Sequence, residues 1–160
     1  MTNKESFIAV LKSANEAAQA AYSGSSKAFV AEPLYRVVQH ENPMDDASKE
    51  VKSWVLPELC GFASLRCGGK DLIVRLIKKY GKKVYYQQNS WDQEAGRKPE
   101  LRGYEFNGWF ASKSYERGYS IDLPCEQKWG QGMVSKERGL HAAIPLLKEL
   151  GSFWVWTHLD

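Results

Sequence analysis

The end of the chain most restricts the possible fold, because four elements follow one another there. An apolar run at residues 119–124 leads into a glycine turn at residues 127–132, and apolar positions with helical spacing occupy residues 134–150. An aromatic run, residues 153–156, closes the series. This pattern predicts strand, turn, helix and strand. Backbone N–H groups at such a turn can face a phosphate, although the same order is ordinary for chains that mix helices and strands.

Length and composition favour one globular domain. The chain has 160 residues, of which 43% are hydrophobic and 26% charged. It is long enough to bury a core without metal ions or disulfides. No apolar run approaches the ~20 residues that a membrane helix needs, and residues 1–24 lack the features of a signal peptide. We therefore expect a cytoplasmic protein that does not contact a membrane.

The cysteines indicate reduced thiols. Cys60, Cys67 and Cys125 are odd in number, and none of the spacings is C-x-x-C. Three thiols cannot all pair within one chain, and a reducing compartment agrees with the expected location. We expect no disulfide.

The first half of the chain predicts a long helix and several strands. Thr2 and Glu5 have the spacing of a capping box, and apolar residues then recur at helical spacing over residues 4–22. Gly24 is the expected terminator, with a flexible loop at residues 23–26. Strands are expected at residues 34–39 and 61–66, and Asp46 is expected to cap a short helix that reaches Val55.

The middle of the chain predicts a crossover and a hairpin. A helix opens at residues 68–71 and closes at Gly81, and a strand follows at residues 83–87. Strand, helix and strand suggest a β-α-β crossover with parallel strands. Asn107-Gly108 between aromatic runs predicts a tight β-hairpin, because both residues tolerate positive φ. The fold class that combines these elements is α+β, with a mixed β-sheet.

The last elements predict a kinked helix and a central strand. Pro145 removes a hydrogen bond within the helix at residues 134–150 and is expected to kink or divide it. In the strand after Gly151, aromatic and aliphatic side chains occupy both faces over residues 153–159. A strand that is apolar on both faces is typical of the inside of a covered sheet.

Positive charge is concentrated in the middle third of the chain. Residues 66–102 contain ten Lys and Arg against four Asp and Glu, whereas the net charge of the whole chain is only +3. Aromatic residues lie between the cations, and cations with flat aromatic surfaces are what single-stranded nucleic acids bind. Solvated lysines at a helix end would also explain the pattern. The candidate contact residues for nucleic acid or an acidic partner are Lys78, Lys79, Lys82, Lys83, Tyr85, Tyr86, Trp91, Arg97, Lys98 and Arg102.

The glycine turn supports an alternative, enzymatic interpretation. Gln127-x-x-Gly130-x-Gly132 resembles the loop with which GNAT acetyltransferases hold the coenzyme A pyrophosphate between a strand and a helix. The resemblance covers about 40 residues. It implies a coenzyme A site at Gln127, Gly130 and Gly132. The chain departs from the family pattern where Pro145 interrupts the helix.

Other catalytic patterns are weaker. Glu50-x-Lys52 and Glu126-x-Lys128 have a spacing found in metal-dependent nucleases, but neither has a suitable upstream aspartate. The acidic loop after His40 could ligate a metal, yet a polar loop with a helix cap explains it without one. We therefore expect no metal site and no catalytic cysteine.

Six Trp and eight Tyr exceed what a small core usually needs. Exposed aromatic residues are favoured anchors of protein interfaces. The sequence therefore favours a non-enzymatic binding protein, similar in type to the accessory and inhibitor proteins of phages. Its expected partner is nucleic acid or an acidic protein surface, and an acetyltransferase is the alternative.

Overall fold

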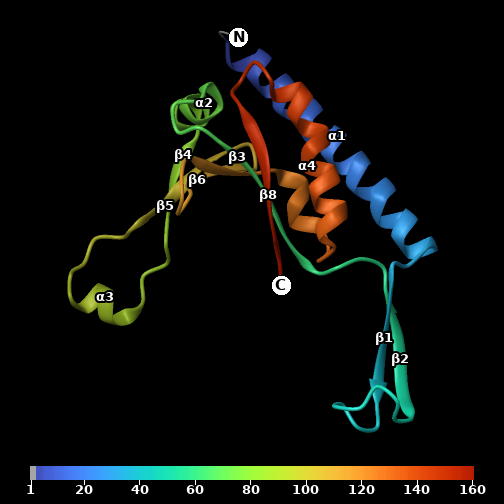
Figure 1. Cartoon of the computed structure of the whole chain (residues 1–160). Helices are drawn as coiled ribbons and strands as arrows, with labels where there is room; N and C mark the ends of the chain where they lie inside the picture. Colours follow the sequence, from blue (N-terminus) through green and yellow to red (C-terminus); the bar gives the residue numbers. More distant parts are fainter. Residues whose placement is uncertain (1–2) are drawn as a thin grey trace.

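The computed structural model describes residues 3–160, which form helices on one side of an antiparallel sheet and two projecting arms (Figure 1). In the described part of the chain the elements are α1 (Lys4–Ala31), β1 (Tyr35–His40), β2 (Glu50–Leu56), β3 (Gly61–Cys67), α2 (Leu72–Tyr80), β4 (Lys82–Tyr85), α3 (Ser90–Glu94), β5 (Leu101–Phe106), β6 (Trp109–Lys113), β7 (Tyr119–Asp122), the 3-10 helix η1 (Pro124–Lys128), α4 (Met133–Leu147) and β8 (Phe153–Leu159).

Helix α1 is longer than the sequence indicated. The Asn3 side chain caps its start by accepting a hydrogen bond from the backbone N–H of Ser6, at 2.7 Å. The expected cap at Thr2 lies outside the described residues. The helix continues through Gly24, so the predicted loop at residues 23–26 is wrong. Ser25 and Phe29 are buried on the face that packs against α4, and this packing outweighs the ~1 kcal/mol cost of one helical glycine.

The six-stranded sheet has the order β4-β5-β6-β7-β3-β8, and every neighbouring pair is antiparallel. The α+β class is confirmed, but the sheet is antiparallel where a mixed sheet was expected. Strands β3 and β4 run in the same direction and α2 connects them, as the crossover predicts. They are not neighbours, because β5, β6 and β7 return between them later in the chain.

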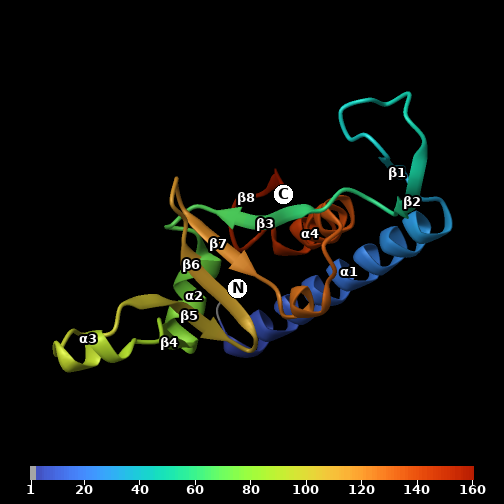
Figure 2. The same ribbon diagram turned by 90° about the horizontal axis from the view of Figure 1, so that it is seen from below.

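The helices lie on one face of this sheet and leave the other uncovered (Figure 2). The covered face holds the core, in which the Phe7 ring of α1 stacks on Phe106 of β5 with 5.5 Å between centroids. Successive side chains of a strand point to opposite faces, so the register defines the uncovered one. We call this the open face; its side chains include Phe62, Arg66, Lys82, Val84, Glu105, Phe110, Ser120, Asp122, Trp154 and Trp156.

Glycines form the turns of two hairpins in this sheet. Asn107 has φ 50° and Gly108 φ 82°, which confirms the hairpin between β5 and β6. The next hairpin turns at Gly118, with φ 77°, and a Cβ built there would lie 2.1 Å from the carbonyl oxygen of Cys67. Only glycine fits this turn without a shift of the backbone.

The helix expected between Asp46 and Val55 is wrong, because residues 50–56 form β2 and pair with β1. These two strands form a separate hairpin, the β1–β2 arm, residues 35–56. Cross-strand pairs such as Val37 with Trp54 stabilise it, and this long-range pairing overrides the local helix signal.

Helix α4 is continuous to Leu147, so Pro145 does not divide it. Strand β8 pairs only with β3 and is an edge strand, so the predicted central position is wrong. The covered face buries part of Phe153 and Val155, whereas Trp154 on the open face is 43% exposed. Among residues 3–160, no helix combines the length and apolar character that a bilayer crossing requires.

Candidate nucleic-acid interface

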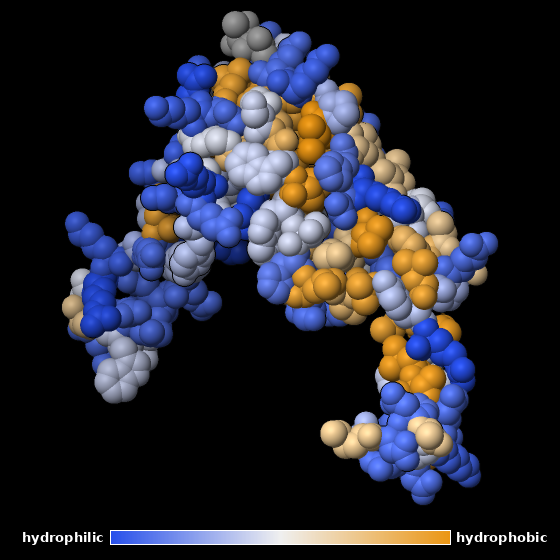
Figure 3. Space-filling model, in the orientation of Figure 1, coloured by the Kyte–Doolittle hydropathy of each residue, from blue (hydrophilic) through white to orange (hydrophobic). Residues whose placement is uncertain are grey.

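The ten predicted contact residues follow one continuous path. They start in the last turn of α2, continue along β4 and the loop that carries α3, and end in β5. Residues 86–100 of this path project from the sheet (Figure 1), and we call them the α3 arm. The arm is predominantly hydrophilic (Figure 3). The structure therefore joins the predicted residues along one edge of the molecule.

Several of the predicted cations are already engaged within the protein. Lys78 Nζ donates a hydrogen bond to the Tyr119 hydroxyl at 2.8 Å. Lys82 pairs with Glu105 at 3.2 Å, and Arg97 pairs with Asp92 at 3.1 Å. Phosphate contacts from these three side chains would compete with existing partners.

Four other cations form no ion pair within residues 3–160. They are Lys79, Lys83, Lys98 and Arg102. All four are exposed, and the Arg102 guanidinium lies 5.1 Å from the centroid of the Phe110 ring. These side chains can meet phosphate oxygens without losing a carboxylate partner.

The three predicted aromatic residues are exposed. Tyr85 and Tyr86 retain 49% and 53% of their surface, and Trp91 in α3 retains 81%. The Asn89 side chain caps α3 by accepting a hydrogen bond from the Asp92 N–H at 2.8 Å, which helps to hold Trp91 on the outside of the arm. Such rings are available for stacking on bases.

A β-bulge turns Arg102 toward the open face. Val84 pairs with Gly103 and Tyr85 pairs with Leu101, which leaves Arg102 as the extra residue of β5. Bulges commonly redirect a side chain in this way. Gly103 makes room for the Phe110 ring, because a Cβ there would lie 2.7 Å from Phe110 Cζ.

A hollow at the base of the arm adds residues that sequence reasoning missed. Tyr86 and Arg102 line it together with Lys113 and Tyr115 of the β6–β7 hairpin, and its volume is about 440 Å³. Tyr115 is fully exposed. A Lys and a Tyr in a hairpin turn were a possible signal, but only the folded sheet brings them beside Tyr86. Two tyrosines and two cations therefore share one hollow.

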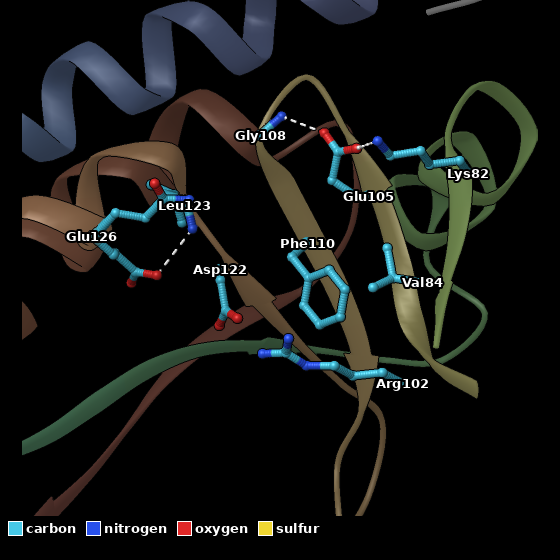
Figure 4. Close-up of a pocket in the computed structure, with 10 residues that line it drawn as sticks. Lys82, Val84, Arg102, Glu105, Gly108, Phe110, Asp122, Leu123 and Glu126 are labelled. Atoms are coloured by element: carbon cyan, nitrogen blue, oxygen red, sulfur yellow. Dashed lines mark hydrogen bonds and ion pairs between the residues drawn. The ribbon is translucent and has the colours of Figure 1, made fainter. Parts of the chain in front are cut away.

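A second pocket, of about 690 Å³, lies on the open face between Arg102 and η1 (Figure 4). Glu126 is half-buried and accepts a hydrogen bond from the Leu123 N–H at 2.9 Å. Burial, with a smaller contribution from Asp122, raises the pKa of Glu126 to about 8. The pKa of Asp122 is also raised, because the surrounding protein reduces the hydration of its carboxylate, and nearby Arg102 opposes this shift. Asp122 nevertheless remains exposed to solvent. The pocket can hold a proton near neutral pH.

The glycine turn is occupied by the protein itself. Gly130 N–H donates to the Tyr22 hydroxyl at 2.7 Å, and the Met133 N–H donates to the Leu59 carbonyl at 3.0 Å. The buried Glu58 carboxylate accepts from the Ser135 N–H at 2.8 Å, at the start of α4. A carboxylate thus lies against Gly132, in the turn where the GNAT resemblance places a pyrophosphate, and these contacts do not favour the acetyltransferase alternative.

Two of the three thiols, Cys67 and Cys125, are buried. All three cysteines are free, which confirms that the chain has no disulfide. Burial raises the pKa of Cys67 and of Cys125 to about 12 in each case, so both remain protonated at neutral pH. Within residues 3–160, no three His, Cys, Asp or Glu side chains gather as ligands for a metal ion.

Comparisons with known proteins add no relative. No protein-family model matches the chain, and neither a curated protein nor a solved structure is significantly similar to it.

Proposed function

We propose that the protein binds single-stranded nucleic acid, without catalysis, along the α3 arm and the hollow at its base. The supporting observation is that Tyr86 and Tyr115 line the same hollow as Arg102 and Lys113. Bases stack on flat aromatic rings, and phosphates prefer cations beside them.

The arrangement suits a strand whose bases are unpaired. Rings that are half exposed or more, such as Tyr86 and Trp91, can be covered by a base on one side without leaving their place in the fold. Lys83 in β4 and Lys98 in the arm have no carboxylate partner within residues 3–160, and they would meet the phosphates of the nucleic acid. A base pair would hide the surfaces that stack, so we expect duplexes to bind more weakly.

Binding is measured by fluorescence anisotropy of labelled single-stranded DNA and RNA at low salt. Tyr86→Ala and Tyr115→Ala should each weaken binding about 5- to 150-fold, which corresponds to ~1–3 kcal/mol per stacked base. Trp54→Ala is the matched control, because Trp54 is a partly exposed aromatic residue on the other arm. The Trp54→Ala variant should bind the labelled DNA and RNA with the same affinity as the unmodified protein.

A triple charge variant tests the cations at the base of the arm together. Replacing Lys79, Lys82 and Lys83 by Glu should abolish binding, and the affinity of the unmodified protein should fall steeply with salt. If no DNA or RNA is retained at low salt, the nucleic-acid proposal is wrong. An acidic protein surface would then be the leading candidate partner.

A further inference from the structure

The outer edge of β8 is unusually open to pairing. The strand pairs with β3 through all seven of its residues, without a bulge, and its other side lies at the margin of the sheet (Figures 1 and 2). Residues 153–159 contain no Lys, Arg, Asp, Glu, Pro or Gly. Natural sheets use such residues, bulges or short strands to prevent edge-to-edge pairing. None of these protections is present in β8.

The opposite edge of the same sheet is protected. Strand β4 has only four residues, two of which are Lys82 and Lys83, and its pairing with β5 is interrupted by a bulge. The chain then leaves the sheet into the α3 arm. The absence of protection is therefore specific to β8.

The composition of β8 is typical of an inner strand. Phe153 and Val155 pack on the core from the covered face, and Trp154 and Trp156 occupy the open face. Such a strand usually has neighbours on both sides, but the single chain supplies only β3.

We propose that β8 pairs with β8 of a second copy of this chain, antiparallel and about a twofold axis at Trp156. In this register all seven residues are paired, and the two six-stranded sheets become one continuous sheet. Trp156 then lies opposite its own copy, and Trp154 lies opposite His158 of the second copy. Phe153 lies opposite Leu159.

A second copy suits this edge because the strand is self-complementary. Every pair in the register joins apolar, aromatic or neutral polar residues when His is neutral, so no like charges oppose each other. Aromatic cross-strand pairs add stability. The axis is perpendicular to the sheet, so the helices of both copies lie on one side and both open faces on the other.

The test is sedimentation equilibrium of the full chain over a range of concentrations, which should show a dimer. Trp156→Glu should raise the dissociation constant at least about tenfold, because two carboxylates would face each other across the axis. Within one chain the new carboxylate would lie beside Arg66, whose guanidinium is 4.3 Å from the centroid of the Trp156 ring, so the fold is expected to persist.

Phe62→Glu is the matched control. Phe62 is 56% exposed on the same open face, but it belongs to β3 and lies one strand away from the axis. This variant should remain dimeric. Circular dichroism of both variants verifies that they are folded.

Cross-linking tests the register independently of affinity. In a Cys60→Ser background, Trp156→Cys should form a disulfide-linked dimer on mild oxidation, because directly opposite residues have Cα atoms ~4.5–5.5 Å apart. Trp154→Cys should not, because it lies opposite His158. A chain that is monomeric at all concentrations, or that cross-links equally at both positions, would show the proposal to be wrong.

Discussion

The two edges of the six-stranded sheet differ in length, in charge and in their connection to the rest of the chain. Strand β4 is short, carries Lys82 and Lys83, and leads into a polar arm. Strand β8 is longer, is uncharged, and packs Phe153 and Val155 against the core. One edge therefore leads into a solvated arm, while the other contributes to the core and has no strand on its outer side within residues 3–160.

The largest expected effect on stability comes from removing β8, and removal of the α3 arm is the contrasting case. Deletion of residues 153–160 should abolish cooperative folding, because it removes core contacts and exposes β3. The loss of several kcal/mol is a large share of a typical ~5–15 kcal/mol total. Replacing residues 87–99 by Asn-Gly should leave the domain folded, because the hydrogen bond between Tyr86 N–H and the Glu100 carbonyl is kept.

Thermal unfolding followed by circular dichroism distinguishes the two deletions. If the chain without β8 melts as cooperatively as the full chain, β8 is only an appendage. If the chain without the arm fails to fold, the arm is structural, and the contrast between the edges is lost.

An intermediate effect on the free energy of unfolding is expected at Glu126, in the pocket between the two sheet edges. The folded protein holds a proton there up to about pH 8, whereas the unfolded chain releases it near 4.5. The free energy of unfolding should therefore fall as the pH rises through this window. Glu126→Gln should flatten this dependence and stabilise the fold at pH 9 by on the order of 2 kcal/mol, allowing for partial screening.

Urea unfolding at a series of pH values measures this dependence. Glu149→Gln is the control, because Glu149 is an exposed carboxylate with no ion pair within residues 3–160. An identical pH profile for Glu126→Gln and the unmodified protein would contradict the raised pKa.

A smaller effect is expected from the Lys82–Glu105 pair at the β4 edge. The N–H of Gly108 and, to a lesser degree, Lys82 lower the pKa of Glu105. The resulting stability is present above the usual carboxyl pKa and is lost as the pH falls through the lowered one. Lys82→Met should cost less than about 1 kcal/mol, because the ion pair is exposed.

Acid titration of stability identifies the main contributor. Lys82→Met should keep most of the acid sensitivity, since the Gly108 N–H remains. If the sensitivity disappears with Lys82, the ion pair dominates, and the β4 edge depends on its lysine for stability as well as for solubility.

The smallest effect on stability is expected at Lys83. Lys83→Val should change the free energy of unfolding by no more than about 0.5 kcal/mol, because the side chain is exposed. It should nevertheless increase self-association, because it removes a charge from the edge. Sedimentation velocity checks this, with Lys98→Val as a control off the sheet. If self-association of the Lys83→Val variant is unchanged, the short length of β4 and its bulge are sufficient to protect this edge.

Local chemistry explains which elements could be predicted from the sequence. The hairpin at Asn107 and Gly108 depends on two adjacent residues that tolerate positive φ. Helix α2 depends on an apolar stripe between two glycine-containing ends. Strand β1 was placed to within a residue because it contains aromatic and β-branched residues, which favour strands.

The failed predictions all depend on distant partners. Gly24 lies within α1 because α4 covers the neighbouring buried positions, and residues 50–56 form a strand because β1 lies beside them. The open face could not be predicted either. No pattern in the sequence predicts which face of the sheet the helices cover.

The candidate site was predicted only in part. The alternation of cations and aromatic residues between Lys78 and Arg102 identified the arm, because these residues are close in the chain. Tyr115 and Lys113 belong to a different hairpin, and they join Tyr86 only after the strands pair. The sequence also did not predict that Lys82 and Arg97 form ion pairs within the protein.

Residue type and short spacing were sufficient to predict the α+β class, the free thiols and the Asn107–Gly108 turn. Three features emerged only from the assembled fold: β8 is an edge strand, Glu58 fills the glycine turn, and one face of the sheet is open. These features could not be predicted because strand order and burial depend on contacts between residues that are far apart in the chain. No local sequence pattern specifies which of these residues pair.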